Sequence, residues 1–258
     1  MRSRRTEFQD IGKAAISAQL LPMENDARLA TADRSDGSML PEMRDDHWYR
    51  HLVDKMDAPW AELKNNNVSF VTFNYDRSLE RFLEITWSHR YKKPLNDVRD
   101  MIASFKIIHV YGSLGSLDER AANHVPYGAF IHRRDPNSIR QFTMRAAAGI
   151  KVIPEARDES DEFRAARMLM SAASRVIFLG FAFDKTNVKR LGGSSAVGAN
   201  TLLQASSFRR TNAERDHIAS MFGRTDSRPD IPVGPRPTMD FVDQTSLMTL
   251  RHLYPLDA

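Results

Sequence analysis

Polar side chains that could take part in chemistry follow an apolar run at residues 68–73. The run has the composition of a buried strand, and Asn74 and Asp76 come directly after it. Ligands of α/β sheets bind beyond the carboxyl ends of the strands. The uncharged amide of Asn74 can hold a hydroxyl or a water without competing for a proton that a reaction must move. We therefore predict a ligand site at this strand end, with capping of the next helix as the alternative role of both residues.

The same design recurs twice further along the chain. Residues 106–111 read as a strand that ends at Tyr111 and is followed by Gly-Ser-Leu-Gly, and residues 176–183 read as a strand followed by Asp184. His109 lies two residues before Tyr111, on the same face of the strand and about 6 to 7 Å further from its end. A loop without bulky side chains after Tyr111 would let its backbone approach a phosphate, although a simple turn explains the glycines equally well.

Helical patterns lie on both sides of these runs. Apolar residues from Phe8 to Leu21 recur at three- and four-residue steps and predict an amphipathic helix that Pro22 ends. Residues 149–153 read as a short strand, which a helix would join to the strand at 176–183 in a right-handed parallel crossover. Helices are predicted at residues 45–58, 77–87, 158–173, 199–222 and 241–254.

Three motifs in this order resemble the sirtuin-like family of NAD-binding domains, especially its prokaryotic branch with NAD-degrading defence proteins. The motifs are residues 72–76, 109–113 and 179–184 with Asn187, and the resemblance covers roughly residues 68–191. In that family the Asn of the first motif contacts the nicotinamide ribose and helps to place the attacking group, and the resemblance gives this role to Asn74.

The family's general base is a His directly before the Gly of the second motif. Tyr111 stands at that position here, and His109 stands two residues earlier, so the catalytic candidates are Asn74, Tyr111 and His109. Tyr has an ordinary pKa of about 10 and is a poor base at neutral pH. The residues that the resemblance assigns to the cofactor are Thr72, Asn74, Asp76, Gly112, Ser113, Gly180, Asp184 and Asn187.

The resemblance implies an α/β fold with a doubly wound, mostly parallel, Rossmann-like sheet. Residues 1–66 would form an added helical N-terminal segment, residues 67–191 the core, and residues 192–258 a helical C-terminal part of the same domain. The implied ligand is NAD or an ADP-ribose-type nucleotide, and the implied reaction is NAD hydrolysis to nicotinamide and ADP-ribose. The resemblance also implies a role in antiviral defence. No glycine-rich, phosphate-binding loop precedes residue 68, so an alternative is a binding or protein-interaction module without catalysis.

The amino-acid composition argues against several kinds of site and function. The chain has no Cys, which excludes disulfides and Cys nucleophiles, and without a four-Cys zinc module protein deacylation is not expected. His47 and His51 have metal-ligand spacing but no third ligand nearby, so we predict no metal site. The net charge of +4 is modest for a nucleic-acid binder, although Arg133-Arg134 and Arg209-Arg210 could contact phosphates. We expect a cytoplasmic protein without a membrane segment, with a protein partner or a second copy possible.

Overall fold

The computed structural model describes residues 2–26, 29, 48–128, 135–152, 160–229 and 237–252. It divides into two compact units. The first unit comprises residues 1–44 and 56–157, and the second comprises residues 45–55 and 158–258. The change of unit at residue 157 falls inside the segment predicted as one core, residues 67–191.

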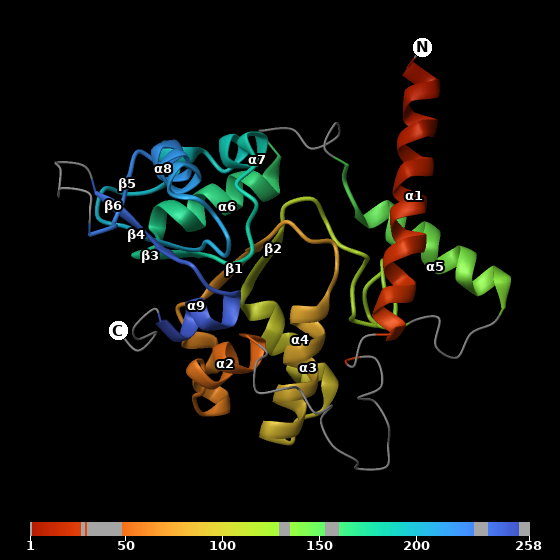
Figure 1. The fold of residues 1–258 in the computed structure, drawn as a ribbon. Coiled ribbons are helices and arrows are strands. Elements are labelled where there is room, and N and C mark those ends of the chain that lie inside the picture. The colour runs from red at the N-terminus through yellow and green to blue at the C-terminus, as the bar shows by residue number, and fades with distance from the viewer. Residues whose placement is uncertain are drawn as a thin grey trace. The chain divides into compact units, whose positions relative to one another are not determined.

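The first unit is built from helices around a short parallel strand pair (Figure 1). Strands β1 (Ser69–Thr72) and β2 (Lys106–His109) run side by side, with Thr72 paired to His109 at their carboxyl ends. This pairing confirms that the two apolar runs are parallel neighbours. Its elements in chain order are α1 (Arg2–Asp26), the 3-10 helix η2 (Trp60–Asn65), β1 (Ser69–Thr72), α3 (Ser78–Tyr91), α4 (Leu95–Ser104), β2 (Lys106–His109) and α5 (Pro136–Gly149).

Helix α1 continues past Pro22, contrary to the predicted end. Proline cannot donate its backbone hydrogen bond, so the last turn must be held by other contacts. Leu21 is fully buried in a core cluster, and Glu24 makes a buried ion pair with Arg77. These two contacts, one on each side of Pro22, stabilise the last turn of the helix, which ends at Asp26.

The second unit holds a four-stranded sheet in the order β3-β4-β6-β5, with every adjacent pair parallel. The predicted helix at 158–173 is confirmed as α6, and Ser160 caps it by accepting a hydrogen bond from the Phe163 N–H. The elements are α2 (Trp48–Lys55), α6 (Asp161–Ala172), β3 (Arg175–Phe178), α7 (Lys185–Arg190), η3 (Gly193–Ala196), β4 (Leu202–Ser206), α8 (Asn212–Met221), β5 (Thr225–Asp226), β6 (Thr238–Val242) and α9 (Ser246–His252).

Two further sequence-based predictions of secondary structure are wrong. Residues 202–206, predicted as the start of a helix, form β4 between two parallel neighbours, because pairing within the sheet overrides the helical propensity of Leu and Ala. Residues 149–153 form no strand within their described part. Gly149 ends α5, and Ile150 makes a single antiparallel bridge to Gly112, so the predicted crossover to β3 does not form.

The architecture is therefore mixed α/β with short parallel strands, as predicted at that level. The strands lie in two hydrogen-bonded sheets of two and four strands. The predicted helical C-terminal part contains β4, β5 and β6 as well as helices. Among the described residues, no helix has the length and apolar character needed to cross a membrane.

Candidate functional site

The carboxyl ends of β1 and β2 gather four polar side chains in the first unit. The His109 imidazole lies between two acceptors, with Nδ1 2.9 Å from the Asn74 carbonyl oxygen and Nε2 2.7 Å from Glu80 Oε1. Asp76 is close enough for its charge to act on His109. Three predicted site residues, Asn74, Asp76 and His109, are thus brought together as expected, with Glu80 added to them.

Both ring nitrogens of His109 act as donors. A backbone carbonyl can only accept, so Nδ1 carries a proton, and a carboxylate accepts the proton on Nε2. Burial lowers the pKa of His109, but the hydrogen bond and charge of Glu80, the Asn74 carbonyl and the Asp76 charge outweigh burial and raise it above 6.5. At a pH below this raised pKa, the pair is an imidazolium held by the Glu80 carboxylate rather than a free base.

This ion pair should make the stability of the first unit depend on pH. Because the pKa of His109 is raised in the folded state, its contribution is fully present below about pH 6.5 and is lost as the pH rises through the folded-state pKa. Urea unfolding between about pH 6 and pH 9 should show this decline, and Glu80→Gln should flatten it. A decline of equal size in Glu80→Gln would show that another group causes it.

The carboxamide of Asn74 is the most accessible polar group of the four. Asn74 is exposed, and its side chain makes no hydrogen bond to any described part of the chain. Its backbone N–H is held at 3.1 Å by Thr72 Oγ1, which fixes the turn after β1. Thr72 therefore positions Asn74, and the Asn74 side chain is free to contact a ligand.

Asp76 has a structural role and some spare hydrogen-bonding capacity. Its Oδ1 accepts from the N–H and the hydroxyl of Ser78, the first residue of α3, and so fixes the turn that was considered as the alternative role. The N-cap position itself is Arg77, which makes no side-chain capping hydrogen bond. Glu80 follows one helical turn later on α3. Its Oε2 is buried and has no hydrogen-bond partner among the described residues, so this oxygen could accept from a ligand hydroxyl or a water.

The sequence reasoning missed Glu80. A signal for it existed, because Glu80 lies in the first turn of the helix that follows Asp76 and is therefore close to the end of β1. The sequence did not reveal that this turn of α3 lies against the end of β2, since that requires the parallel pairing of β1 with β2.

Tyr111 does not take the position predicted for a base. Its side chain is buried, and its ring makes an edge contact with Phe73 at 5.8 Å between centroids. A ring packed in the core contributes to stability rather than to a solvent-facing site. Of the two predicted bases, only His109 contacts the polar groups of the site, since it lies next to Asn74 and Glu80.

The loop after Tyr111 cannot cradle a phosphate in the predicted way. Its backbone N–H groups are already used, since Gly112 donates to the His109 carbonyl, Ser113 to the Gly149 carbonyl and Leu114 to the Tyr75 carbonyl. A Cβ on Gly112 would lie 2.0 Å from the Gly149 carbonyl oxygen. The glycine therefore serves close backbone packing, and the assignment of Gly112 and Ser113 to a phosphate is corrected.

The third predicted motif belongs to the second unit. Gly180 has a φ of 61° and donates its N–H to Ser206 Oγ at 2.9 Å. Asp184 caps α7 by accepting from the N–H groups of Thr186 and Asn187. The capping role considered for Asp184 is thus observed, whereas Asn187 lies within α7 and only donates its backbone N–H to that cap. The three motifs do not fall in one unit, and the polar group around His109 contains only the first two.

Comparisons with known proteins identify no relative. No protein-family model, no curated protein and no solved structure matches this chain. The site must therefore be interpreted from its own geometry.

The part of the chain described by the structure does not bring together a metal site. No group of three or more His, Asp or Glu side chains there is arranged to hold a metal ion. His47 of the predicted pair lies outside the described residues.

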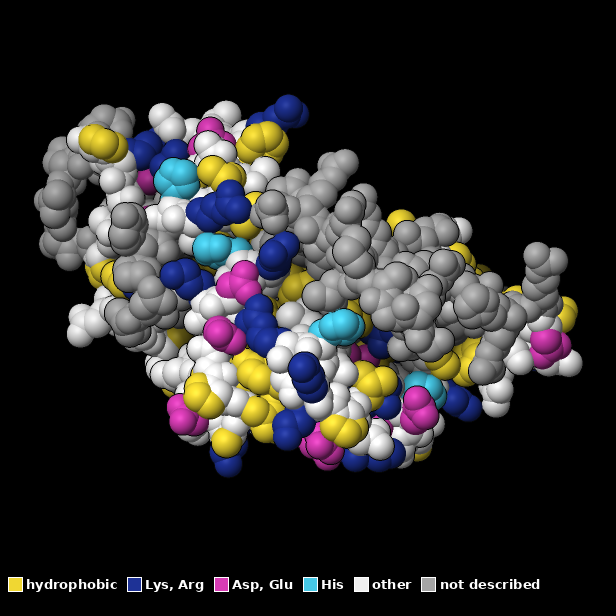
Figure 2. Space-filling view, turned by 90° about the horizontal axis from the view of Figure 1, so that it is seen from below, with side chains coloured by type: hydrophobic (Ala, Val, Ile, Leu, Met, Phe, Trp, Pro, Cys, Tyr) yellow, Lys and Arg dark blue, Asp and Glu magenta, His cyan; other side chains and the backbone are white. Residues whose placement is uncertain are grey.

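The basic residues considered for nucleic-acid binding give little support to that role. Arg133 and Arg134 lie outside the described residues. Arg210 donates to the carbonyls of Phe181 and Ala182, and the Arg209 guanidinium lies over the Phe208 ring at 5.0 Å. On the face drawn in Figure 2, Lys and Arg side chains alternate with acidic and hydrophobic ones. A nucleic-acid-binding surface more often has a continuous basic stripe.

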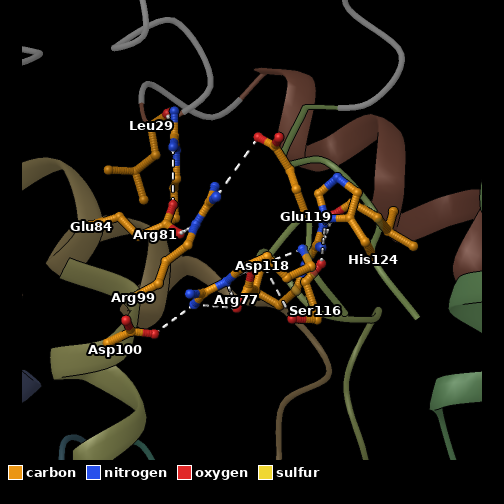
Figure 3. Close-up of polar contacts among 12 residues, drawn as sticks. Leu29, Arg77, Arg81, Glu84, Arg99, Asp100, Ser116, Asp118, Glu119 and His124 are labelled. Carbon is orange, nitrogen blue, oxygen red and sulfur yellow. Dashed lines mark hydrogen bonds and ion pairs between the residues drawn. The ribbon is translucent and has the colours of Figure 1, made fainter. Parts of the chain in front are cut away.

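A separate set of buried charged side chains includes Arg81 and Glu84 on α3 itself (Figure 3). Arg81 and Arg99 both bind the buried Glu84, at 3.1 and 2.8 Å. Arg77 pairs with Glu24 at 2.5 Å and also donates to the Val125 carbonyl. Each charge has a partner of opposite sign, so these residues form a structural network that ties α1 and α4 to α3.

At its outer edge this network reaches solvent. The Arg120 guanidinium pairs with Asp100 at 2.6 Å and with Asp118 at 2.8 Å, and Arg99 contacts Glu119 at 3.7 Å. Hydrogen bonds from Arg120 lower the pKa of Asp118 to about 2. These exposed pairs are screened by water and contribute little to stability.

Proposed function

We propose that the protein binds an NAD-type nucleotide at the carboxyl ends of β1 and β2 and hydrolyses its nicotinamide–ribose bond. The observation that carries the proposal is the exposed, unpartnered carboxamide of Asn74 beside the carboxylates of Asp76 and Glu80 and the His109 imidazolium. The ordered motifs that resemble sirtuin-like domains supply the ligand class. The resemblance also supports a role in antiviral defence through loss of NAD.

The chemistry of these groups suits cleavage at a ribose carbon. Departure of nicotinamide leaves an oxocarbenium-like ribose, and nearby carboxylates stabilise such a cation. Asn74 would hold a ribose hydroxyl or the attacking water. The proton that the water loses would go to Asp76 or Glu80, because His109 already carries a proton on each ring nitrogen. The products are nicotinamide, ADP-ribose and one proton.

Asn74→Ala tests this assignment most directly. We expect nicotinamide release from NAD, followed by chromatography, to fall about 100-fold or more, as for loss of a group that positions the attacking water. Asn96→Ala is the matched control, because Asn96 is also exposed in the first unit but lies on α4. Unchanged nicotinamide release in Asn74→Ala would refute the role of Asn74.

A second candidate function is nucleotide binding without turnover. Two observations favour it: both His109 nitrogens are occupied, and Tyr111 is buried. In that case NAD and ADP-ribose should raise the melting temperature of the wild-type chain, and Asn74→Ala should lose the shift. Ligand at about 100 times its Kd adds roughly 2.7 kcal/mol of stability. Consumption of NAD by the pure protein would exclude this candidate.

A further inference from the structure

The turn after β2 has little capacity left for binding a phosphate. The backbone N–H groups of Gly112, Ser113 and Leu114 already donate to the carbonyl oxygens of other residues. An N–H that holds such a bond must break it before it can donate to a ligand, so the ligand gains little from it. These three donors therefore offer no net attraction to the phosphates of a dinucleotide.

The arginine that adjoins the site in sequence is also engaged elsewhere. Arg77 follows Asp76, but its side chain is 1% exposed and its charge is paired with the buried Glu24. Its guanidinium also donates to the carbonyl oxygens of Val125 and Pro126. An arginine that binds a phosphate uses these same guanidinium donors. Because they are held in the buried network of the first unit, Arg77 is not available to a phosphate at the site.

The third motif, taken by itself in the second unit, shows the same pattern. Gly180 is one of the residues that the resemblance assigns to the cofactor, and its N–H donates to Ser206 Oγ. Asp184 uses its carboxylate to cap α7 and, as an anion, would repel a phosphate. Neither group is arranged to bind the phosphates of a dinucleotide.

The charges beside Asn74 favour a cation over an anion. Asp76 and Glu80 each carry a negative charge, and the protonated His109 balances only one of them. The pyridinium ring of nicotinamide bound to ribose is cationic and is attracted by the excess negative charge, whereas a phosphate on the 5′ carbon of the same ribose is repelled. Both groups of one ribose lie within a Debye length, about 8 Å at physiological salt, so screening leaves both effects in place.

We propose that the preferred substrate of this site is a pyridinium ribonucleoside, nicotinamide linked to ribose without phosphate. The inference rests on the proposed cleavage of the nicotinamide–ribose bond and narrows its substrate class. The bond between C1′ and the ring nitrogen breaks with its electron pair on the nitrogen, which makes nicotinamide neutral, and a water oxygen bonds to C1′. The proton of that water passes to Asp76 or Glu80 and then to solvent, so the products are nicotinamide, ribose and one proton.

Nicotinamide release from three compounds by the full chain tests the proposal. The compounds are nicotinamide riboside, nicotinamide mononucleotide and NAD, which share the scissile bond and differ in their phosphates. The kcat/KM should be highest for nicotinamide riboside. An equal or higher kcat/KM for the mononucleotide or for NAD would overturn the inference and leave the proposed cleavage standing. Absence of release from all three would refute the proposed function and this inference with it.

A charge variant tests the cause of the preference. Asp76→Asn removes one negative charge from the site, so the ratio of kcat/KM for nicotinamide riboside to that for NAD should fall about threefold or more. The ratio is informative even if the variant is slower with both substrates. Asp97→Asn is the matched control, because Asp97 is an exposed carboxylate of the first unit on α4, and it should leave the ratio unchanged. An unchanged ratio in Asp76→Asn would contradict the proposed role of the site's charge.

Discussion

Arg77→Met should lower the free energy of unfolding by about 3 to 5 kcal/mol, the loss expected when one partner of a buried ion pair is removed. The Arg77 side chain is 1% exposed and the Glu24 side chain 3% exposed. The substitution leaves the Glu24 carboxylate without its partner and removes a donor from the Val125 carbonyl. Chemical denaturation followed by circular dichroism measures the change.

A double variant separates the ion pair from simple loss of packing. Arg77→Met combined with Glu24→Met should be more stable than Arg77→Met alone, because no unpaired buried charge remains. Arg120→Met is the control, since its ion pairs with Asp100 and Asp118 are exposed, and it should change stability little. If Arg77→Met behaves like Arg120→Met, the buried network does not hold α1 to α3.

The pH dependence of Arg77→Met gives an independent check. Burial already raises the pKa of Glu24 above 4.5 against the lowering effect of Arg77. Without Arg77 the pKa should rise further. A carboxyl whose folded-state pKa is raised stabilises the fold below its unfolded pKa and loses that contribution as the pH rises. The difference in unfolding free energy between the wild type and Arg77→Met should therefore be smaller near pH 4.5 than at neutral pH.

Gly112→Ala should cost more than about 2 kcal/mol of stability. The φ of 75° at Gly112 alone costs an alanine about 1 to 2 kcal/mol. The added Cβ would also lie 2.0 Å from the carbonyl oxygen of Gly149, which is backbone and cannot rotate away. Differential scanning calorimetry should show a large fall in Tm.

Two other glycines provide controls. Gly180 also has a positive φ, 61°, but the nearest atom to an added Cβ would be Ser246 Oγ at 3.8 Å, so Gly180→Ala should show the conformational cost alone. Gly12→Ala lies in α1 with no atom within 4 Å and should stabilise the helix by up to about 1 kcal/mol. If Gly112→Ala is as stable as Gly180→Ala, Gly112 is not needed for close backbone packing, and a ligand could approach the backbone there.

Local sequence patterns predicted the elements whose periods were clear. The helix after Asp76 follows from apolar spacing, and the helix at 161–172 follows from apolar spacing and acidic residues at its start. The apolar runs at β1, β2 and β3 were found as strands, although each proved shorter than predicted. The clustering of Asn74 with His109 followed from one rule, that ligand groups gather at the carboxyl ends of parallel strands.

The predictions that failed concern features that depend on contacts between distant parts of the chain. The Leu-rich segment at 202–206 became a strand because two parallel neighbours pair with it. The sequence predicted that the glycines after Tyr111 leave room for a phosphate. In the structure the backbone at Gly149 occupies the space next to Gly112. Glu80 was overlooked because its hydrogen bond is to His109, which lies on strand β2, 29 positions later in the chain.

The second unit is discontinuous in sequence, and this affects how it can be made. Its helix α2 is synthesised early and packs on α9, which is synthesised about two hundred residues later, after the whole of the first unit. During translation α2 therefore remains without its partner while residues 56–157, the second segment of the other unit, are synthesised. A fragment cut at residue 157 would lose α2 and uncover part of α9. Expression of the C-terminal half alone should thus give a less stable protein than its four-stranded sheet suggests.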